Sequence, residues 1–193
     1  GIRQDSYNSL MVNLVGEDPH PPEFSLDIPV SVVYTPPDAP LTVLAGDDHL
    51  TFNLLECNFQ VSARSFFQVN APIAEKMVQY LLDNLAFNKN TRVLELYAGV
   101  GLFSAFIAEE VGQLTAVESS GSACHDFTIN LAEYENVALY EAETEEVLPA
   151  LDTKFDLLIV DPPRAGLDPG VHDALLSIQP QQIAYISCDP ATL

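Results

Sequence analysis

One continuous stretch, Arg92–Glu118, constrains the fold of this chain more than any other part of the sequence. It opens with a short, mostly apolar run at Val93–Leu96, which is typical of a strand covered on both faces. After a glycine-containing turn, Leu102–Val111 shows helical periodicity, and Leu114–Val117 reads as a second strand. The stretch therefore predicts a strand, a turn, a helix and a strand parallel to the first.

Two glycines and one acid in this unit predict a site for a nucleoside-containing cofactor. Gly99 and Gly101 allow a tight turn and a close approach of a ligand to the backbone, below the free amides of the following helix. Glu118, at the carboxyl end of the second strand, can accept hydrogen bonds from both hydroxyls of a ribose. Because Ser104 replaces the third glycine of the dinucleotide fingerprint, S-adenosylmethionine fits better than NAD. The alternative is a turn that only packs the helix against the strand.

Strands and helices continue to alternate after Glu118. We expect strands at 137–140, 155–161 and 183–187, and helices at 121–133, 143–151 and 169–178. This order predicts an α/β fold with a doubly wound, mostly parallel, Rossmann-like sheet. Ligands of such sheets bind beyond the carboxyl ends of the strands, where Tyr97, Glu118, Asp161 and Cys188 fall.

The N-terminal part has a different organisation. We expect a small β-rich module at 1–62, which offers a platform for RNA, followed by a cofactor-binding domain at 63–193. Its expected strands are 7–16, 28–34, 41–44, 50–55 and 59–62, and they are separated by proline-containing loops. Asn70 can cap the next helix, with Pro72 in its first turn. The apolar face of that helix is expected to contain Ile73, Met77, Tyr80, Leu81 and Leu85.

Composition excludes several classes of protein. With 193 residues of which 48% are hydrophobic, the chain can bury a core, and it contains no run long enough to span a membrane. Three scattered cysteines predict neither a disulfide framework nor a zinc site, so we expect a cytoplasmic protein. The net charge of −21 argues against strong non-specific binding of nucleic acid, although most of these acids are expected only to solvate the surface.

Two segments near the end of the chain carry further chemistry. Asp161 is followed by two prolines, which stiffen the loop and remove two backbone donors. Arg164 stands where amino-group methyltransferases have an aromatic residue, and it suits a phosphate or a carbonyl. Cys188 lies just past a strand end, where a nucleophile and a buried core thiol are both possible readings.

Four segments together resemble the RNA uridine-5-methyltransferase family, which makes 5-methyluridine in tRNA or ribosomal RNA. These segments are SFFQVN, LELYAGVGLFS, DPPRAGL and YISCDPATL. The resemblance implies that Gln68, Tyr97, Glu118 and Asp161 bind S-adenosylmethionine, with S-adenosylhomocysteine as product, and that Cys188 is the nucleophile. We also assign Asp161 to the catalytic group, and Arg164, Phe67 and Asn70 to contacts with the RNA. Asp189 departs from the asparagine that usually follows the cysteine.

The family chemistry needs one more group than this chain supplies. A thiolate that adds to C6 of uracil activates C5, and a base must later remove the C5 proton. In the family that base is a glutamate well downstream of the cysteine, so we expect an inactive, monomeric fragment that still binds the cofactor. The four cysteines of an iron–sulfur cluster and the upstream RNA-binding barrel of some members are not expected in this chain. The alternatives are a cytosine-5 RNA methyltransferase, an amino-group methyltransferase and a non-catalytic relic that binds RNA or cofactor.

Overall fold

A parallel sheet forms the centre of the C-terminal part of the molecule. The computed structural model describes residues 1–23, 25–36, 39–68, 70–151 and 154–187. The sheet contains β7 (Arg92–Leu96), β8 (Gln113–Glu118), β9 (Val137–Glu141), β10 (Leu157–Val160) and β11 (Gln182–Tyr185). In the described part of the chain it has five strands, all parallel, in the order β11-β10-β7-β8-β9. The predicted doubly wound α/β fold is confirmed.

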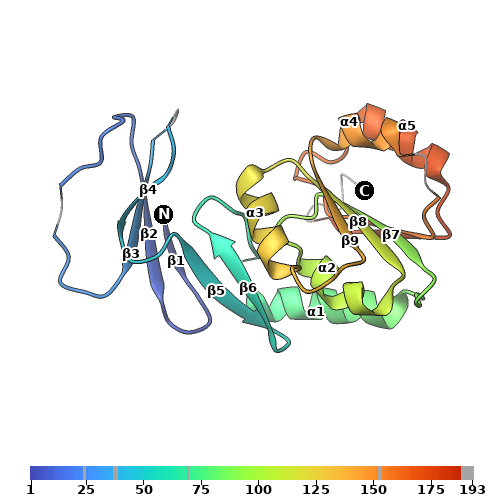
Figure 1. The fold of residues 1–193 in the computed structure, drawn as a ribbon, viewed down its shortest axis with the longest axis horizontal. Helices are drawn as coiled ribbons and strands as arrows, with labels where there is room; N and C mark the ends of the chain where they lie inside the picture. Colours follow the sequence, from blue (N-terminus) through green and yellow to red (C-terminus); the bar gives the residue numbers. More distant parts are fainter. Residues whose placement is uncertain (24, 37–38, 69, 152–153, 188–193) are drawn as a thin grey trace.

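Helices cover both faces of this sheet (Figure 1). They are α1 (Ala71–Asn84), α2 (Leu102–Ile107), α3 (Gly121–Asn130), α4 (Thr144–Val147) and α5 (Pro169–Ile178), with short 3-10 turns at Ala108–Glu110 and Leu148–Ala150. Alternate strand residues point to opposite faces, so Val93 packs with α1, α2 and α3 while Leu94 packs with α4 and α5. Burial on both faces explains why these strands are apolar almost throughout.

The strand order reverses beside β7, and this reversal positions the candidate site. The chain moves from β7 outward through β8 to β9, and then returns to the other side of β7 for β10 and β11. The crossovers leave the carboxyl ends of β7 and β10 side by side, with the connecting segments departing in opposite directions. Such a switch point is where open α/β sheets bind their ligands.

The N-terminal part is β-rich, as predicted. Its strands are β1 (Ile2–Gln4), β2 (Leu10–Val15), β3 (Ser31–Thr35) and β4 (Thr42–Ala45), followed by the hairpin β5 (His49–Leu54) and β6 (Cys57–Ser62). The first four strands form one sheet in sequence order. The short strand β1 was not predicted, because three residues are too few to show a period.

The hairpin turn differs from the predicted one. It lies at Leu55 and Glu56, one residue before the expected Glu56–Asn58 segment, and both residues have positive φ angles, of 48° and 68°. A two-residue turn with both φ angles positive matches the twist of the strands that it joins. The Asn-Gly pair that usually marks such a turn is absent here, so the exact position of the turn could not be predicted from the sequence.

The hairpin contacts both parts of the molecule. On one side Leu50 packs with Met11 and Val33 of the first sheet. On the other side Phe59 and Val61 belong to the large core that also contains α1, α2 and α3. The division into 1–62 and 63–193 therefore stays a prediction, in which the hairpin is the connecting element.

The first helix begins as predicted and buries part of the predicted apolar face. The side chain of Asn70 accepts a hydrogen bond from the amide of Ile73, and Pro72 lies in the first turn. The buried residues are Ala74, Val78 and Leu81, whereas Ile73 is 49% exposed and Tyr80 is 72% exposed. Of the predicted apolar face, Leu81 is buried and Met77 and Leu85 pack against the core, so the prediction was wrong only for Ile73 and Tyr80.

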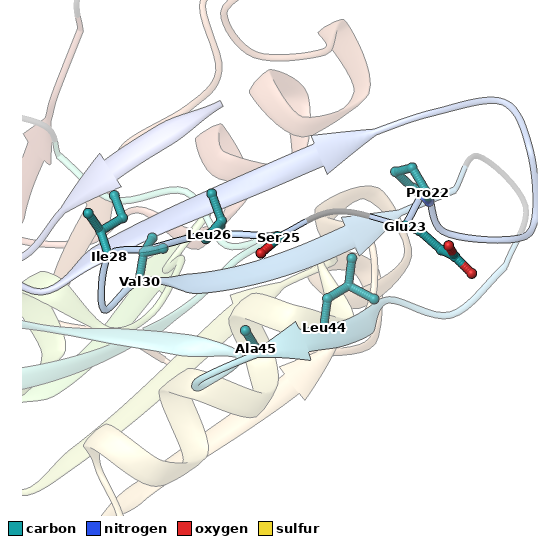
Figure 2. Close-up of a pocket in the computed structure, with 8 residues that line it drawn as sticks. All are labelled: Pro22, Glu23, Ser25, Leu26, Ile28, Val30, Leu44 and Ala45. Atoms are coloured by element: carbon teal, nitrogen blue, oxygen red, sulfur yellow. The ribbon is translucent and has the colours of Figure 1, made fainter.

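An open hollow of about 640 Å³ lies in the β-rich part, away from the ends of the parallel strands (Figure 2). Its lining consists of Pro22, Glu23, Ser25, Leu26, Ile28, Val30, Leu44 and Ala45. Within the described residues, no helix is both long and apolar enough to cross a membrane.

Candidate functional site

The turn after β7 holds its backbone in an unusual conformation. Tyr97, Gly99 and Gly101 have positive φ angles of 60°, 58° and 89°. A Cβ atom on Gly101 would lie 2.5 Å from Leu131 Cδ2, so a larger residue would have to displace that side chain in addition to adopting a strained positive φ angle. A Cβ atom on Gly99 would have no neighbour within 4 Å, so the space above this residue is open. The turn thus leaves bare backbone facing open space at Gly99, and the binding of a ligand there stays a prediction.

Backbone amides fix the carboxylate of Glu118 beside this open space. The amide of Gly99 donates to Oε2 at 2.8 Å, and the amides of Ser119 and Ser120 donate to Oε1 at 2.9 and 2.8 Å. A carboxylate offers about four acceptor sites, so acceptor capacity remains on Oε2. The side chain is only partly buried, which leaves it accessible to a hydroxyl donor.

Two further carboxyl groups lie near the carboxyl ends of the parallel strands. Asp161 follows β10, and burial raises its pKa from 3.8 to about 6. Glu95 on β7 is 2% exposed, and its carboxylate accepts a hydrogen bond from the hydroxyl of Ser104 on α2. Burial raises the pKa of Glu95 to about 8, and the charges of Asp161 and Glu118 also raise it. At neutral pH the buried Glu95 therefore keeps its proton, and the negative charge near the turn comes from Glu118 and Asp161.

The buried Glu95 has a consequence for stability. A carboxyl group whose pKa rises from 4.5 to about 8 on folding keeps its proton in the folded state while the unfolded chain loses it. Folding stability is therefore lost as the pH rises through this window. Between roughly pH 5 and 7, we expect the free energy of unfolding of Glu95→Gln to rise relative to that of the wild type by about 1.4 kcal/mol for each pH unit. Urea unfolding at several pH values measures this difference, and a difference that does not change with pH would contradict the expectation.

The other residues predicted to bind the cofactor come from separate segments of the chain. Tyr97 follows β7 directly and is partly buried, and burial raises the pKa of its hydroxyl. Gln68 is partly buried in the segment between β6 and α1. Cys188 lies outside the described residues. The strand before it, β11, runs parallel to β10 and ends at the same edge of the sheet.

The three residues predicted to contact RNA have different surroundings in the structure. Arg164 is exposed in the loop after β10. Phe67 is 7% exposed, and its ring lies 4.9 Å from that of Phe52, so it belongs to the core. Asn70 uses its side chain to cap α1. The exposed aromatic residue of this segment is Phe66, which is 71% exposed and which the sequence analysis did not single out.

The sequence analysis also missed the polar residues inside the fold. Glu95 interrupts an apolar run, and this interruption was the available signal. Asp126 and Asn130 lie one helical turn apart on α3, and Asp126 is fully buried. In the described part of the chain, no cluster of His, Cys, Asp or Glu is arranged to hold a metal ion.

Comparison with known proteins agrees with this geometry. An uncharacterized RNA methyltransferase of Thermosynechococcus vestitus is 38% identical over 153 residues, which is 78% of this chain and 34% of the relative. An uncharacterized RNA methyltransferase of Streptomyces coelicolor is 33% identical over 177 residues, which is 89% of this chain and 39% of the relative. The chain thus spans little more than a third of the length of these relatives.

A solved structure has the same fold over nearly the whole chain. It is the Pyrococcus abyssi tRNA (uracil-54, C5)-methyltransferase in complex with S-adenosyl-L-homocysteine, with a TM-score of 0.76 and 25% identity. The match covers 99% of this chain and 50% of that protein. The sequence model of the tRNA (uracil-5-)-methyltransferase family matches residues 46–156 and 151–193. On this match and on the relatives above, the chain belongs to the tRNA (uracil-5-)-methyltransferase family.

Proposed function

We propose that this chain is the cofactor-binding and catalytic part of an enzyme that methylates C5 of a uridine in tRNA or ribosomal RNA. One observation carries the proposal: the amide of Gly99 and the carboxylate of Glu118 form a fixed pair beside open space at the switch point of the sheet. Membership of the family, whose model matches from residue 46 onward, gives this pair its chemical context.

The site fits S-adenosylmethionine in shape and in charge. Gly99 leaves room for a ligand against the backbone, Glu118 can bind ribose hydroxyls, and Asp161 and Tyr97 follow the neighbouring strand ends. We propose that these residues, with Gln68 and Gly101, hold the cofactor. When bound, the cofactor supplies a methyl group activated by a sulfonium centre, and S-adenosylhomocysteine is the product.

We propose Cys188 as the nucleophile. Addition of its thiolate to C6 of the uracil ring forms a carbon–sulfur bond and moves an electron pair to the ring, which makes C5 nucleophilic. After methyl transfer, a base removes the proton from C5 and the cysteine leaves. The resemblance to the family implies that this base is a glutamate well downstream of the cysteine. We therefore propose that the 193-residue chain alone binds cofactor but does not turn over.

The charge of the chain bears on how RNA binds. Its 28 acids and 7 bases give a net charge of −21, and phosphate neutralisation supplies much of the affinity for RNA. Six of the seven bases are exposed, but six positive charges cannot offset 28 acids. They are Arg64, Lys76, Lys89, Arg92, Lys154 and Arg164. Because the chain spans about a third of its relatives, we propose that most of the basic surface for RNA lies in other segments of the protein.

The pH dependence of cofactor binding tests the role of Asp161. We propose that the carboxylate of Asp161 attracts the cationic amino group of S-adenosylhomocysteine. Because its pKa is about 6, the carboxylate gains a proton as the pH falls through this value, and this attraction is then lost. We expect the affinity of the chain for S-adenosylhomocysteine to fall by about tenfold between roughly pH 7.5 and 5. In Asp161→Asn the affinity should be low at both pH values. Titration calorimetry measures both, and an unchanged pH profile in the variant would contradict this role.

The direct test of the proposed function uses RNA that contains 5-fluorouridine. Fluorine cannot leave as a cation, so a covalent adduct persists after methyl transfer even without the base. After incubation of the complete protein with S-adenosylmethionine and this RNA, mass spectrometry should show the adduct on the protein. If the complete protein gives no adduct and instead methylates an exocyclic amino group, an amino-group methyltransferase replaces the proposal.

A further inference from the structure

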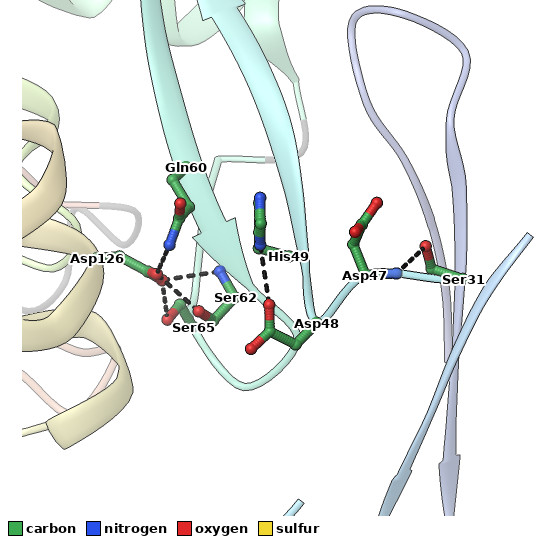
Figure 3. Close-up of polar contacts among 8 residues, drawn as sticks. All are labelled: Ser31, Asp47, Asp48, His49, Gln60, Ser62, Ser65 and Asp126. Carbon is green, nitrogen blue, oxygen red and sulfur yellow. Dashed lines mark hydrogen bonds and ion pairs between the residues drawn. The ribbon is translucent and has the colours of Figure 1, made fainter. Parts of the chain in front are cut away.

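Helix α3 presents two polar side chains to the outer edge of strand β6. Asp126 accepts hydrogen bonds from the amide and the hydroxyl of Ser62 at 2.7 and 2.6 Å, and from the hydroxyl of Ser65 (Figure 3). Asn130 accepts a hydrogen bond from the amide of Gln60 at 2.8 Å and donates to the carbonyl of the same residue at 3.1 Å. The two side chains therefore pair with strand β6 as a neighbouring strand would.

The spacing of the two elements makes this pairing possible. Residues four apart on a helix lie on one face, about 6 Å apart along the axis. Alternate residues of a strand are about 6.7 Å apart, and their backbone groups point to the same edge. The spacing of Asp126 and Asn130 on the helix therefore matches the spacing of Ser62 and Gln60 on the strand. This edge of β6 is available to them, since β5 pairs with the other edge. The side chains of Asp126 and Asn130 thus satisfy backbone hydrogen-bonding groups at an edge of β6 that would otherwise be open.

Asn130 makes one further contact, and it reaches the cofactor turn. Its amide nitrogen also donates to the carbonyl of Val100 at 2.9 Å, between Gly99 and Gly101. Among the described residues, the side chain of Asn130 makes three hydrogen bonds to backbone atoms, two on β6 and one on the glycine turn. The end of α3 also packs against this turn, where Leu131 and Phe127 leave no room for a Cβ atom on Gly101.

We propose that Asn130 is a positioning residue that holds the glycine turn in register with β6 and thereby shapes the cofactor site. Two separate segments meet at this side chain. One is the turn that carries Gly99, and the other is β6, which leads through Ser65, held by Asp126, to Gln68. The inference rests on the proposed cofactor-binding function, and it adds a residue that does not itself contact the cofactor.

A second asparagine provides a matched control. The amide nitrogen of Asn136 also donates to two backbone carbonyls, those of Ala108 and Val111, at 2.8 and 3.0 Å. It is partly buried like Asn130, but it lies before β9, at the amino ends of the parallel strands. Loss of its hydrogen bonds should therefore affect stability and leave the cofactor turn unchanged.

The experiment compares Asn130→Asp with Asn136→Asp. Each variant replaces an amide donor by an acceptor that faces carbonyl oxygens. Three measurements are made: the affinity for S-adenosylhomocysteine by calorimetry, the thermal midpoint, and the hydrogen exchange of residues 97–101. In Asn130→Asp we expect exchange at 97–101 to accelerate about tenfold and the affinity to fall about tenfold, whereas Asn136→Asp should change both by less than about twofold. If the new charge near Asp126 prevents folding, the pair Asn130→Ala and Asn136→Ala takes their place.

The outcomes separate this inference from the proposed function. Unchanged exchange at 97–101 in the Asn130 variant would overturn the inference, whatever the affinity. An equal loss of affinity in both variants would also overturn it, because the effect would then follow from stability alone. A wild-type chain that is folded and does not bind S-adenosylhomocysteine would instead overturn the proposed function, and the exchange data would still decide whether Asn130 holds the turn.

Discussion

Replacement of Cys188 by alanine is expected to abolish the covalent adduct with 5-fluorouridine RNA. Without the thiolate, C6 of the ring has no nucleophile and C5 stays unreactive toward the methyl group. In the complete protein we expect the rate of uridine methylation to fall on the order of 10³-fold or more, as is usual when a covalent nucleophile is removed. Intact-mass spectrometry detects the adduct, and nucleoside analysis of the RNA measures the methylation.

Cys57→Ala is the matched control for this prediction. Cys57 is a free thiol on β6, and burial raises its pKa, so it is a poor nucleophile. This variant should form the adduct as the wild type does. An adduct that persists in Cys188→Ala, or that disappears in Cys57→Ala, would contradict the assignment.

The second large effect is expected for Glu118→Gln. The glutamine keeps the shape of the side chain, but it replaces one carboxylate oxygen by an NH₂ group that must face an amide donor of Gly99 or of Ser119 and Ser120. It also removes the charge that strengthens a hydrogen bond to a ribose hydroxyl. We expect the affinity for S-adenosylhomocysteine to fall by about 10- to 100-fold. Calorimetry with the purified chain measures this change.

Glu141→Gln is the matched control, because it makes the same chemical change at a neighbouring position. Glu141 ends β9 and is the direct neighbour of Glu118 in the sheet, but it is exposed. Its replacement should change the affinity by less than about twofold, since surface charges contribute little. Equal losses in the two variants would mean that the overall charge of this edge, and not the contact of Glu118 with the turn, governs binding.

The sequence by itself was sufficient for the architecture of the C-terminal part. Apolar runs such as Val93–Leu96 alternate with helical periods, and this alternation leaves a parallel sheet as the arrangement that buries both faces. The helix predicted at Pro169–Ile178 has these bounds in the structure, because Asp168 caps its first turn and a proline follows. Local signals of this kind lie within a few residues of the element that they specify.

The sequence also predicted that several candidate site residues follow strand ends at one edge of the sheet, for a topological reason. The carboxyl ends of parallel strands meet at one edge, so Tyr97, Glu118 and Asp161 could be grouped without knowing any distance. The chemistry at Cys188 came from a resemblance to a family and stays a proposal. Whether Phe67 or Phe66 is exposed could not be predicted, since neighbouring residues of an irregular segment carry no period.

Only the tertiary structure decided which polar groups are buried and what they bind. The pKa of Glu95 depends on burial beneath α2 and on the charges of Asp161 and Glu118, which are distant in the sequence. Asn130 lies 70 residues from Gln60 and 30 from Val100, and it binds both. Periodicity records which side of an element is apolar, but a hydrogen bond between distant segments depends on how whole elements pack, and that is determined only when the chain folds.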